Sequence, residues 1–214
     1  MSQRKLNPFD HIVLGVDQAL RTIWGKPQST GRENPANRHS EGEMNESERV
    51  QTASLMRINH AGEVCAQALY QGQALTAKLD HVRERMEEAA NEENDHLLWC
   101  EQRIKELNSH TSYLNPVWYA GSFAIGATAG LIGDRWSLGF VAETEHQVVK
   151  HLDGHLQHLP ETDHKSRAIL QQMSEDEERH GASAAQAGGI ELPAPIKLGM
   201  KISSKIMTAL AGKI

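Results

Sequence analysis

Glutamates lie within the apolar stripes of this chain, and this feature limits the folds open to it more than any other. Helical periodicity predicts four long helices, with a break at Pro160 and a stop at Gly188 and Gly189. The predicted helices cover residues 48–78, 81–108, 136–158 and 162–187. Because burying a lone carboxylate is costly, these helices must pack so that their glutamates share a positively charged partner.

The angular position of each glutamate around its helix identifies the ones that point inward. At about 100° per residue, five apolar side chains of the second predicted helix fall within about 40° of Glu93. They are Met86, Ala89, Cys100, Ile104 and Leu107. Glu177 and Glu145 are flanked by apolar residues in the same way, and the first helix offers Glu63. One inward glutamate per helix is therefore predicted.

A Glu-x-x-His spacing places a carboxylate and an imidazole on one helical face, about one turn apart, where both can bind one metal ion. Four such pairs occur in the chain: Glu93/His96, Glu143/His146, Glu161/His164 and Glu177/His180. Helical phase puts the second and third pairs outside the core, because Glu143 lies about 160° from Glu145, and Glu161 about 160° from Glu177.

The two halves of the chain repeat one design, in which an inward glutamate precedes an inward Glu-x-x-His pair. Glu63 precedes Glu93 by 30 residues, and Glu145 precedes Glu177 by 32. Four carboxylates neutralise two divalent ions, and two imidazoles complete the ligand set. Such ligands suit iron or manganese better than a metal that prefers thiolates, and we predict two iron ions per chain rather than manganese. The predicted metal ligands, with no further catalytic side chain, are Glu63, Glu93, His96, Glu145, Glu177 and His180.

The order of the predicted elements indicates the architecture. Strand signals are absent, and short turns imply two antiparallel hairpins joined by the long segment 109–135. This arrangement is an all-α, ferritin-like four-helix bundle with one long crossover. We assign residues 1–46 to a short amphipathic helix (10–24) and a flexible linker, residues 47–190 to the bundle, and residues 191–214 to a second amphipathic helix.

The C-terminal segment has the features of a helix that lies in a membrane surface. From Ile196 onward it contains four lysines and no acid, and a basic face beside a broad apolar face suits a lipid headgroup layer. Packing on the bundle or on a second copy of the chain is the alternative. The glycine-rich crossover VWYAGSFAIGATAGLIG is a poor membrane-spanning helix, but it is suited to cap the open end of the bundle. We expect peripheral attachment to the cytoplasmic face of the cell membrane and a lipophilic substrate.

Composition argues against other classes of partner. The net charge of −6 without a polybasic block, and an aromatic content of only 5%, argue against nucleic-acid binding. Cys65 and Cys100 form no CxxC pair, which favours a reducing cytosol, and the residues MSQRKLNPFDH lack the apolar core of a secretory signal. No GxGxxG follows a predicted strand, so we expect electrons to come from an external donor or from the substrate.

Other polar residues near the predicted site are weaker candidates. His60 lies one turn before the first inward glutamate and is interpreted as a surface or hydrogen-bonded histidine rather than a neighbour of the metal ligands. His151 and His155 lie on the flank of the third predicted helix and are placed outside the site. Tyr70 is interpreted as a core tyrosine rather than as a redox residue, and Cys100 as part of the core packing.

Four motifs, in this order, resemble the demethoxyubiquinone hydroxylase family of coenzyme Q biosynthesis, in its bacterial form. They are RINHAGEVCAQALYQGQ around Glu63, EENDHLLWC around Glu93, AETEHQVVKHLDGHLQHLP around Glu145 and EDEERHG around Glu177. The resemblance covers residues 47–214, and the family's six metal ligands match the six positions that helical phase selects.

This resemblance implies a ferritin-like fold, a di-iron centre and peripheral membrane attachment. The implied activity is the O2-dependent hydroxylation of a polyprenylated methoxy-methyl-benzoquinol, demethoxyubiquinol. The chain has Leu152 where animal members have a tyrosine, so no electron-relay role is carried over to that position. The expected partners are the lipophilic quinol, O2, a membrane surface and an external electron donor, and the chain also suits a homo-oligomer or a biosynthetic complex.

Three other functions fit parts of the pattern. A ferritin-like iron store or carrier uses related ligand sets, and another di-iron oxidase or desaturase would act on a fatty substrate. A structural protein at the membrane surface would carry the same glutamates as ordinary solvated charges. Uptake of many irons per chain favours storage, whereas purified protein that binds neither iron nor manganese favours the structural protein.

Overall fold

The computed structural model describes residues 8–214, which form seven α-helices and one 3-10 helix and contain no strand. None of these helices is long and apolar enough to cross a bilayer. In chain order the elements are α1 (Pro8–Trp24), η1 (Pro35–Arg38), α2 (Glu46–Thr76), α3 (Asp80–Glu106), α4 (Asn115–Ile132), α5 (Asp134–His158), α6 (His164–Gln186) and α7 (Ala194–Ala211).

The four long helices begin and end within two residues of the predicted bounds, and local sequence signals mark several of these ends. Asn45 and Glu48 form a capping box at the start of α2, in which each side chain accepts a hydrogen bond from the other's backbone N–H. Asp163 caps α6 by accepting from the backbone N–H of Ser166. Gly133, with φ of 151°, makes the sharp turn between α4 and α5.

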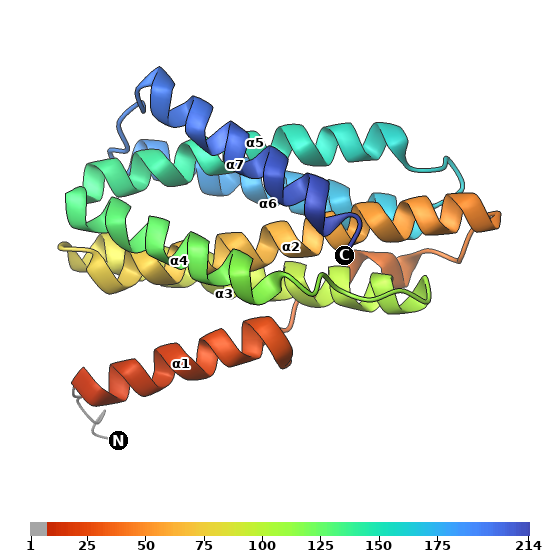
Figure 1. The fold of residues 1–214 in the computed structure, drawn as a ribbon, viewed down its shortest axis with the longest axis horizontal. Helices are drawn as coiled ribbons and strands as arrows, with labels where there is room; N and C mark the ends of the chain where they lie inside the picture. The colour runs from red at the N-terminus through yellow and green to blue at the C-terminus, as the bar shows by residue number, and fades with distance from the viewer. Residues whose placement is uncertain (1–7) are drawn as a thin grey trace.

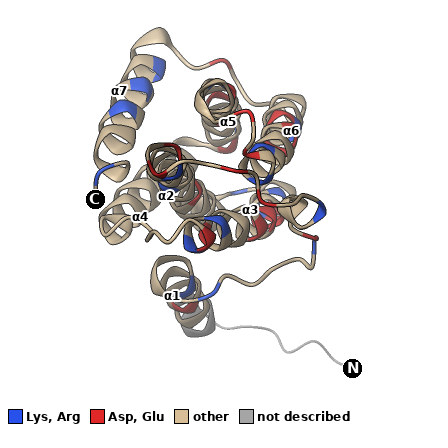
Figure 2. Cartoon of the chain, turned by 90° about the vertical axis from the view of Figure 1, so that its right-hand side faces the viewer, with Lys and Arg blue, Asp and Glu red and all other residues tan. Residues whose placement is uncertain are grey.

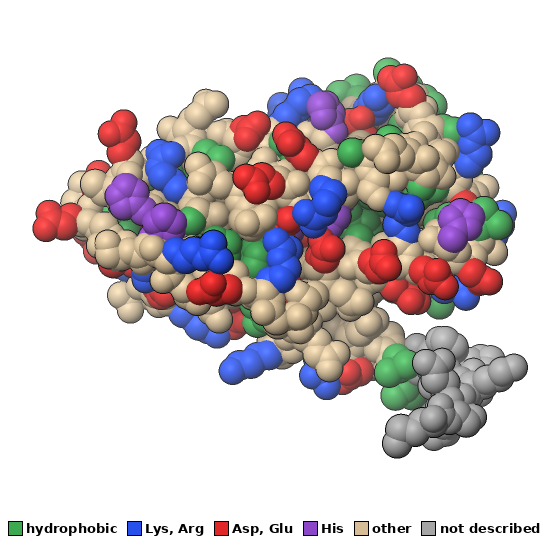
Figure 3. Space-filling model, turned by 180° about the vertical axis from the view of Figure 1, so that it is seen from behind, with side chains coloured by type: hydrophobic (Ala, Val, Ile, Leu, Met, Phe, Trp, Pro, Cys, Tyr) green, Lys and Arg blue, Asp and Glu red, His purple; other side chains and the backbone are tan. Residues whose placement is uncertain are grey.

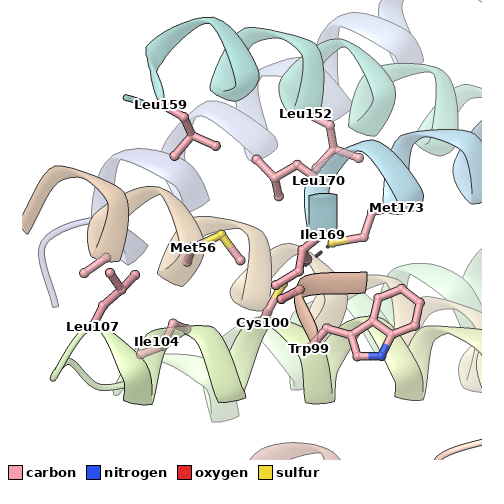
Figure 4. Packing of buried hydrophobic residues seen from close by; sticks show 12 residues of the cluster. Met56, Trp99, Cys100, Ile104, Leu107, Leu152, Leu159, Ile169, Leu170 and Met173 are labelled. Atoms are coloured by element: carbon pink, nitrogen blue, oxygen red, sulfur yellow. Dashed lines mark hydrogen bonds between the residues drawn. The ribbon is translucent and has the colours of Figure 1, made fainter. Parts of the chain in front are cut away.

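Helices α2, α3, α5 and α6 form an antiparallel bundle, seen from the side in Figure 1 and end-on in Figure 2. This arrangement confirms the all-α, ferritin-like prediction, with α2–α3 and α5–α6 as the two hairpins. One buried apolar cluster fills one end of the bundle; Figure 4 shows how its side chains from α2, α3, α5 and α6 point toward one another. Leu152 belongs to this cluster. A second cluster, which includes Tyr70, Met86, Leu138 and Val141, fills the other end.

The crossover contains a helix, α4, that lies lengthwise against α2 (Figure 1). A Cβ atom at Gly72 of α2 would overlap the carbonyl oxygen of Phe123, and one at Gly126 of α4 would overlap that of Leu69. The expectation that this segment caps the open end of the bundle is therefore wrong. Glycines at matching positions let the two helices approach more closely than side chains would allow, so α4 packs along the bundle instead.

Residues 26–45, which we call the strap, lie against α3 and α6. The backbone N–H of Thr30 donates to the carboxylate of Asp95 (2.9 Å), and Asn34 donates to Gln102 (2.7 Å). Further along, Glu41 accepts a hydrogen bond from the buried guanidinium of Arg103 (2.7 Å). The sequence predicts a flexible linker here because these residues lack periodicity. The structure instead holds them on the bundle through polar contacts with residues far away in the sequence.

Helices α1, α4 and α7 follow one another around one side of the bundle (Figure 2). Helix α7 packs on α2, where Ser54 donates to the carbonyl oxygen of Gly212 (2.8 Å). On all three helices, large apolar side chains remain exposed; they include Val16, Leu20 and Trp24 of α1, Val117, Ile125 and Leu131 of α4, and Leu198, Ile202 and Ile206 of α7. The view from behind in Figure 3 shows instead acidic and basic side chains interspersed over the surface.

We expect Gly126→Ala to lower the free energy of unfolding by about 1–3 kcal/mol, because the added methyl group would force α4 away from α2. Gly121, on the same helix, is the matched control, since a Cβ there meets nothing within 4 Å. Gly121→Ala should be neutral or stabilise the protein by about 0.5–1 kcal/mol. Urea denaturation of the metal-free protein measures both changes, and equal effects would contradict the close packing of α2 and α4.

Candidate metal centre

The six predicted ligands come from all four helices of the bundle and are all buried. Helix α2 supplies Glu63, α3 supplies Glu93 and His96, α5 supplies Glu145, and α6 supplies Glu177 and His180. Along every helix they lie between the two apolar clusters at the ends of the bundle. The polar side chains thus form one layer enclosed by apolar layers.

Four of these residues converge on one point. Glu63, Glu93, His96 and Glu177 each offer a ligand atom, and these atoms all lie within 4.8 Å of one another. His96 Nδ1 is 3.1 Å from a carboxylate oxygen of Glu93, 3.1 Å from one of Glu177 and 3.7 Å from one of Glu63.

His180 and Glu145 adjoin this group. His180 Nδ1 lies 3.0 Å from a carboxylate oxygen of Glu177 and 3.4 Å from one of Glu93. Glu145 lines the same cavity as Glu177 and accepts a hydrogen bond from the hydroxyl of the buried Tyr70. The structure therefore brings all six predicted residues together, and it adds Tyr70 as a direct partner of one of them.

Each histidine turns Nδ1 toward the cluster and Nε2 toward a carboxylate on the facing helix. His96 Nε2 lies 3.0 Å from Asp176 of α6, and His180 Nε2 lies 2.9 Å from Glu92 of α3. Arg179 forms salt bridges with both of these outer carboxylates. Carboxylates that bind the outer nitrogen of a metal-binding histidine fix its tautomer and ring orientation.

The outer carboxylates were not identified from the sequence, although it carries a signal for them. In both halves an acid directly precedes the glutamate of the Glu-x-x-His pair, as Glu92 before Glu93 and Asp176 before Glu177. At about 100° per residue, such a neighbour points sideways toward the adjacent helix. A second acid repeated at the same place in each hairpin therefore predicts a partner for the facing histidine.

The carboxylates of the cluster compete for positive charge. Burial and the neighbouring Glu93 raise the pKa of Glu63 well above its usual value, and burial and Glu177 do the same to the pKa of Glu145. Burial also opposes ionisation of Glu93, but hydrogen bonds from His180 and His96 outweigh burial and lower its pKa.

The histidines supply positive charge to these carboxylates. Burial alone would lower the pKa of His96, yet its hydrogen bonds with Asp176 and Glu177 raise that pKa well above the usual value. For His180, hydrogen bonds with Glu177 and Glu93 outweigh burial and raise the pKa to about 12. In the absence of a metal, tightly bound protons thus balance the negative charge of the carboxylates.

The donor set fits a pair of divalent cations. Glu145 Oε2 is buried and accepts no hydrogen bond from any described residue, so it keeps a lone pair for a metal. Four carboxylates and two imidazoles, with the histidine rings held from behind, form a ligand set that suits iron.

Two cavities adjoin the cluster. A cavity of about 480 Å³ between α5 and α6 is bordered by Glu145 and Glu177, with Ala142 and Val149 on its wall and Lys197 of α7 also lining it. A smaller cavity of about 200 Å³ between α3 and α6 is bordered by Tyr70, Glu92 and His180. The larger cavity therefore reaches two carboxylates of the cluster, and the smaller cavity reaches one of its imidazoles.

Apart from Tyr70, the weaker candidates do not join the cluster. His60 is buried, burial lowers its pKa to about 4, and its Nδ1 has no partner among residues 8–214. His155 contacts Asn59 (2.7 Å) and His151 contacts Ser204 of α7 (3.0 Å). Cys100 lies in the apolar core.

The two Glu-x-x-His pairs that phase placed outside the core do not join the cluster. Glu143 forms a salt bridge with Lys197 of α7 (3.3 Å) on the wall of the larger cavity. Glu161 and His164 are exposed at the turn between α5 and α6.

Comparison with known proteins places these residues in a family context. A family model described as ubiquinone biosynthesis protein COQ7 matches residues 50–211. A protein of Nitrosococcus oceani named 3-demethoxyubiquinol 3-hydroxylase is 58% identical over 211 residues, which cover 99% of this chain and 99% of that protein. A protein of the same name from Stutzerimonas stutzeri is 60% identical over 207 residues, or 97% of this chain and 96% of that protein.

We expect the apparent affinity for Mn(II) to rise between about pH 6 and about pH 8, by about tenfold per pH unit for each proton displaced. His96 and His180 must lose their Nδ1 protons, and Glu63 and Glu145 must ionise, before they can bind a cation. The pKa values of all four groups are raised, so these groups hold their protons to higher pH. Protons therefore compete with the cation for the ligand atoms, and they do so more strongly as the pH falls. Calorimetric titrations in two buffers of different ionisation enthalpy count the protons released; an affinity independent of pH would contradict this cluster as the binding site.

Proposed function

This chain belongs to the family of the ubiquinone biosynthesis protein COQ7, and we propose that it acts as a 3-demethoxyubiquinol 3-hydroxylase. The proposed reaction uses O2 to hydroxylate the ring of a polyprenylated methoxy-methyl-benzoquinol. One oxygen atom enters a ring C–H bond and the other leaves as water, with two electrons and two protons supplied by an external donor and solvent or by the quinol itself, which then becomes the quinone. The observation that carries the proposal is the six-residue cluster, which lies entirely within the region matched by the family model.

We propose that the cluster holds two iron ions, with manganese the less suitable metal. When bound, the irons would supply the redox chemistry that activates O2. The proposed ligands are Glu63, Glu93, His96, Glu145, Glu177 and His180. Their burial, and the Glu145 oxygen that accepts no hydrogen bond among the described residues, support this assignment.

The chain's own residues prepare this site in three ways. Asp176 and Glu92 orient the two imidazoles, and the hydroxyl of Tyr70 orients the carboxylate of Glu145. The apolar clusters close the layer to water from both ends of the bundle. The cavity beside Glu145 and Glu177 offers the quinol ring a path from the surface to the metal ligands.

We further propose that the protein attaches peripherally to the cytoplasmic face of the cell membrane. The exposed apolar side chains of α1, α4 and α7 lie on neighbouring helices along one side of the bundle, and Lys201 and Lys205 are exposed on α7. Apolar side chains beside lysines suit an interface with anionic lipid headgroups. Lys197, near the start of α7, lines the larger cavity, so a prenylated substrate leaving this surface would meet the cavity directly.

In cells that lack this protein, we expect demethoxyubiquinone to accumulate and ubiquinone to be depleted. Wild-type protein should restore ubiquinone, whereas Glu177→Ala should not, because it removes a buried carboxylate from the centre of the cluster. Glu161→Ala is the matched control, since Glu161 also begins a Glu-x-x-His pair but is exposed. Quinone profiling by liquid chromatography and mass spectrometry measures the outcome. A normal quinone pool in the deletion strain would refute the proposed activity.

We expect the double substitution Ile202→Glu and Ile206→Glu to weaken binding to anionic lipid vesicles by at least about tenfold, because a buried isoleucine contributes about 1.5–3 kcal/mol. Val50→Glu, at an exposed apolar position of α2, is the control and should bind as the wild type does. Vesicle flotation measures the bound fraction. Unchanged binding by the double variant would exclude this face of α7 from the interface.

A further inference from the structure

The two histidines of the cluster differ in how their outer partners are held. Asp176, behind His96, has a fully buried side chain, whereas the side chain of Glu92, behind His180, is 34% exposed. Glu92 also borders the smaller cavity. The sequence repeats an acid and a histidine at matching positions in both hairpins, but the structure surrounds the two acids differently.

Asp176 has an additional cationic partner that Glu92 lacks. Its Oδ2 atom accepts a hydrogen bond from Arg32 Nη2 (2.6 Å) and lies 3.0 Å from His96 Nε2. Its Oδ1 atom accepts from Arg179 Nη1 (2.8 Å). Because both oxygens are held by guanidinium groups, the carboxylate cannot rotate away from His96 without breaking a charge-assisted hydrogen bond.

Arg32 also supports His96 from a second direction. Its guanidinium lies 5.1 Å from the ring centroid of Trp99, in cation–π geometry, and the Trp99 ring lies 5.3 Å from the imidazole of His96. The side chains of Arg32, Asp176 and Trp99 thus limit both tilt and rotation of the His96 ring.

The strap holds Arg32 in this position. Ser29 donates to Asp95 (2.7 Å) and Asn34 donates to Gln102 (2.7 Å), so α3 anchors the chain on both sides of Arg32. The family model begins at residue 50, which places the strap and Arg32 outside the region that carries the ligand motifs.

We propose that Arg32 is a positioning residue of the metal centre, and that through Asp176 it makes the His96 side of the centre bind its metal more tightly than the His180 side. This inference rests on the proposed metal centre. Outer-shell partners of metal-binding histidines contribute about 10- to 100-fold to metal affinity. A buried carboxylate held by two arginines orients its histidine more firmly than a partly exposed carboxylate held by one.

The test is an anaerobic titration of full-length protein with Mn(II), in which the electron paramagnetic resonance signal of free Mn(II) reports binding. Wild-type protein should bind two Mn(II) ions in steps of different affinity. Arg32→Ala should weaken the tighter step by about 10- to 100-fold and leave the weaker step unchanged. Arg32→Lys should recover part of the loss, because a lysine keeps the charge beside Asp176 but not the planar contact with Trp99.

Arg38→Ala is the matched control, since Arg38 lies in the same strap, is exposed and pairs only with the exposed Glu33 among the described residues. It should bind Mn(II) as the wild type does.

Urea denaturation of each metal-free variant separates positioning from general loss of structure. Equal weakening of both steps by Arg32→Ala, with a matching loss of stability, would overturn the proposal, as would two equal steps in the wild type. If the wild type binds Mn(II) in two steps and Arg32→Ala does the same, this inference fails while the metal centre stands. If the wild type binds none, the metal centre fails with it.

Discussion

The fold depends on one electrostatic constraint: four glutamates, one from each helix of the bundle, are buried in a single layer and need compensating positive charge. Helices α2 and α5 each bury a glutamate but supply no histidine to the cluster, so the positive charge must come from α3 and α6. The helices must converge so that His96 meets Glu177 across the bundle and His180 meets Glu93. The apolar clusters on either side remove the water that would otherwise solvate the carboxylates, and this makes the requirement for charge stronger.

The sequence predicts the helices and the cluster well because both depend on periodicity within a segment. The phase of Glu93 relative to Met86 and Ile104 is a local property, and the repeat of the pattern in the second hairpin restricts the pairing further. Phase also separates Glu177 from Glu161, which the structure leaves exposed at a turn. The tertiary arrangement then follows from the requirement that inward carboxylates share one centre.

The remaining features depend on contacts between distant segments that have no periodic pattern. Arg32 and Asp176 are 144 residues apart, and nothing near Arg32 predicts which helix it contacts. The strap has the composition of a flexible linker and is ordered by individual hydrogen bonds to α3 and α6. The predicted cap is wrong because the apolar, glycine-rich sequence of this segment does not identify the helix against which it packs. Only beside α2 does it become evident that Gly126 permits two backbones to touch.

The close contact of α4 with α2 would also determine how the cluster is positioned at the membrane surface that we propose the protein binds. Gly72 of α2 and Gly126 of α4 each leave room for the backbone of the other helix, so sliding by even one residue would drive a side chain into a carbonyl group. Helix α4, with its exposed apolar residues, is therefore locked in register with the helix that carries Glu63. On a bilayer, the height of the cluster above the lipid would be set by this fixed register rather than by a hinge. The distance that a lipid substrate travels from the bilayer to the cluster would accordingly be constant, because the scaffold sets it.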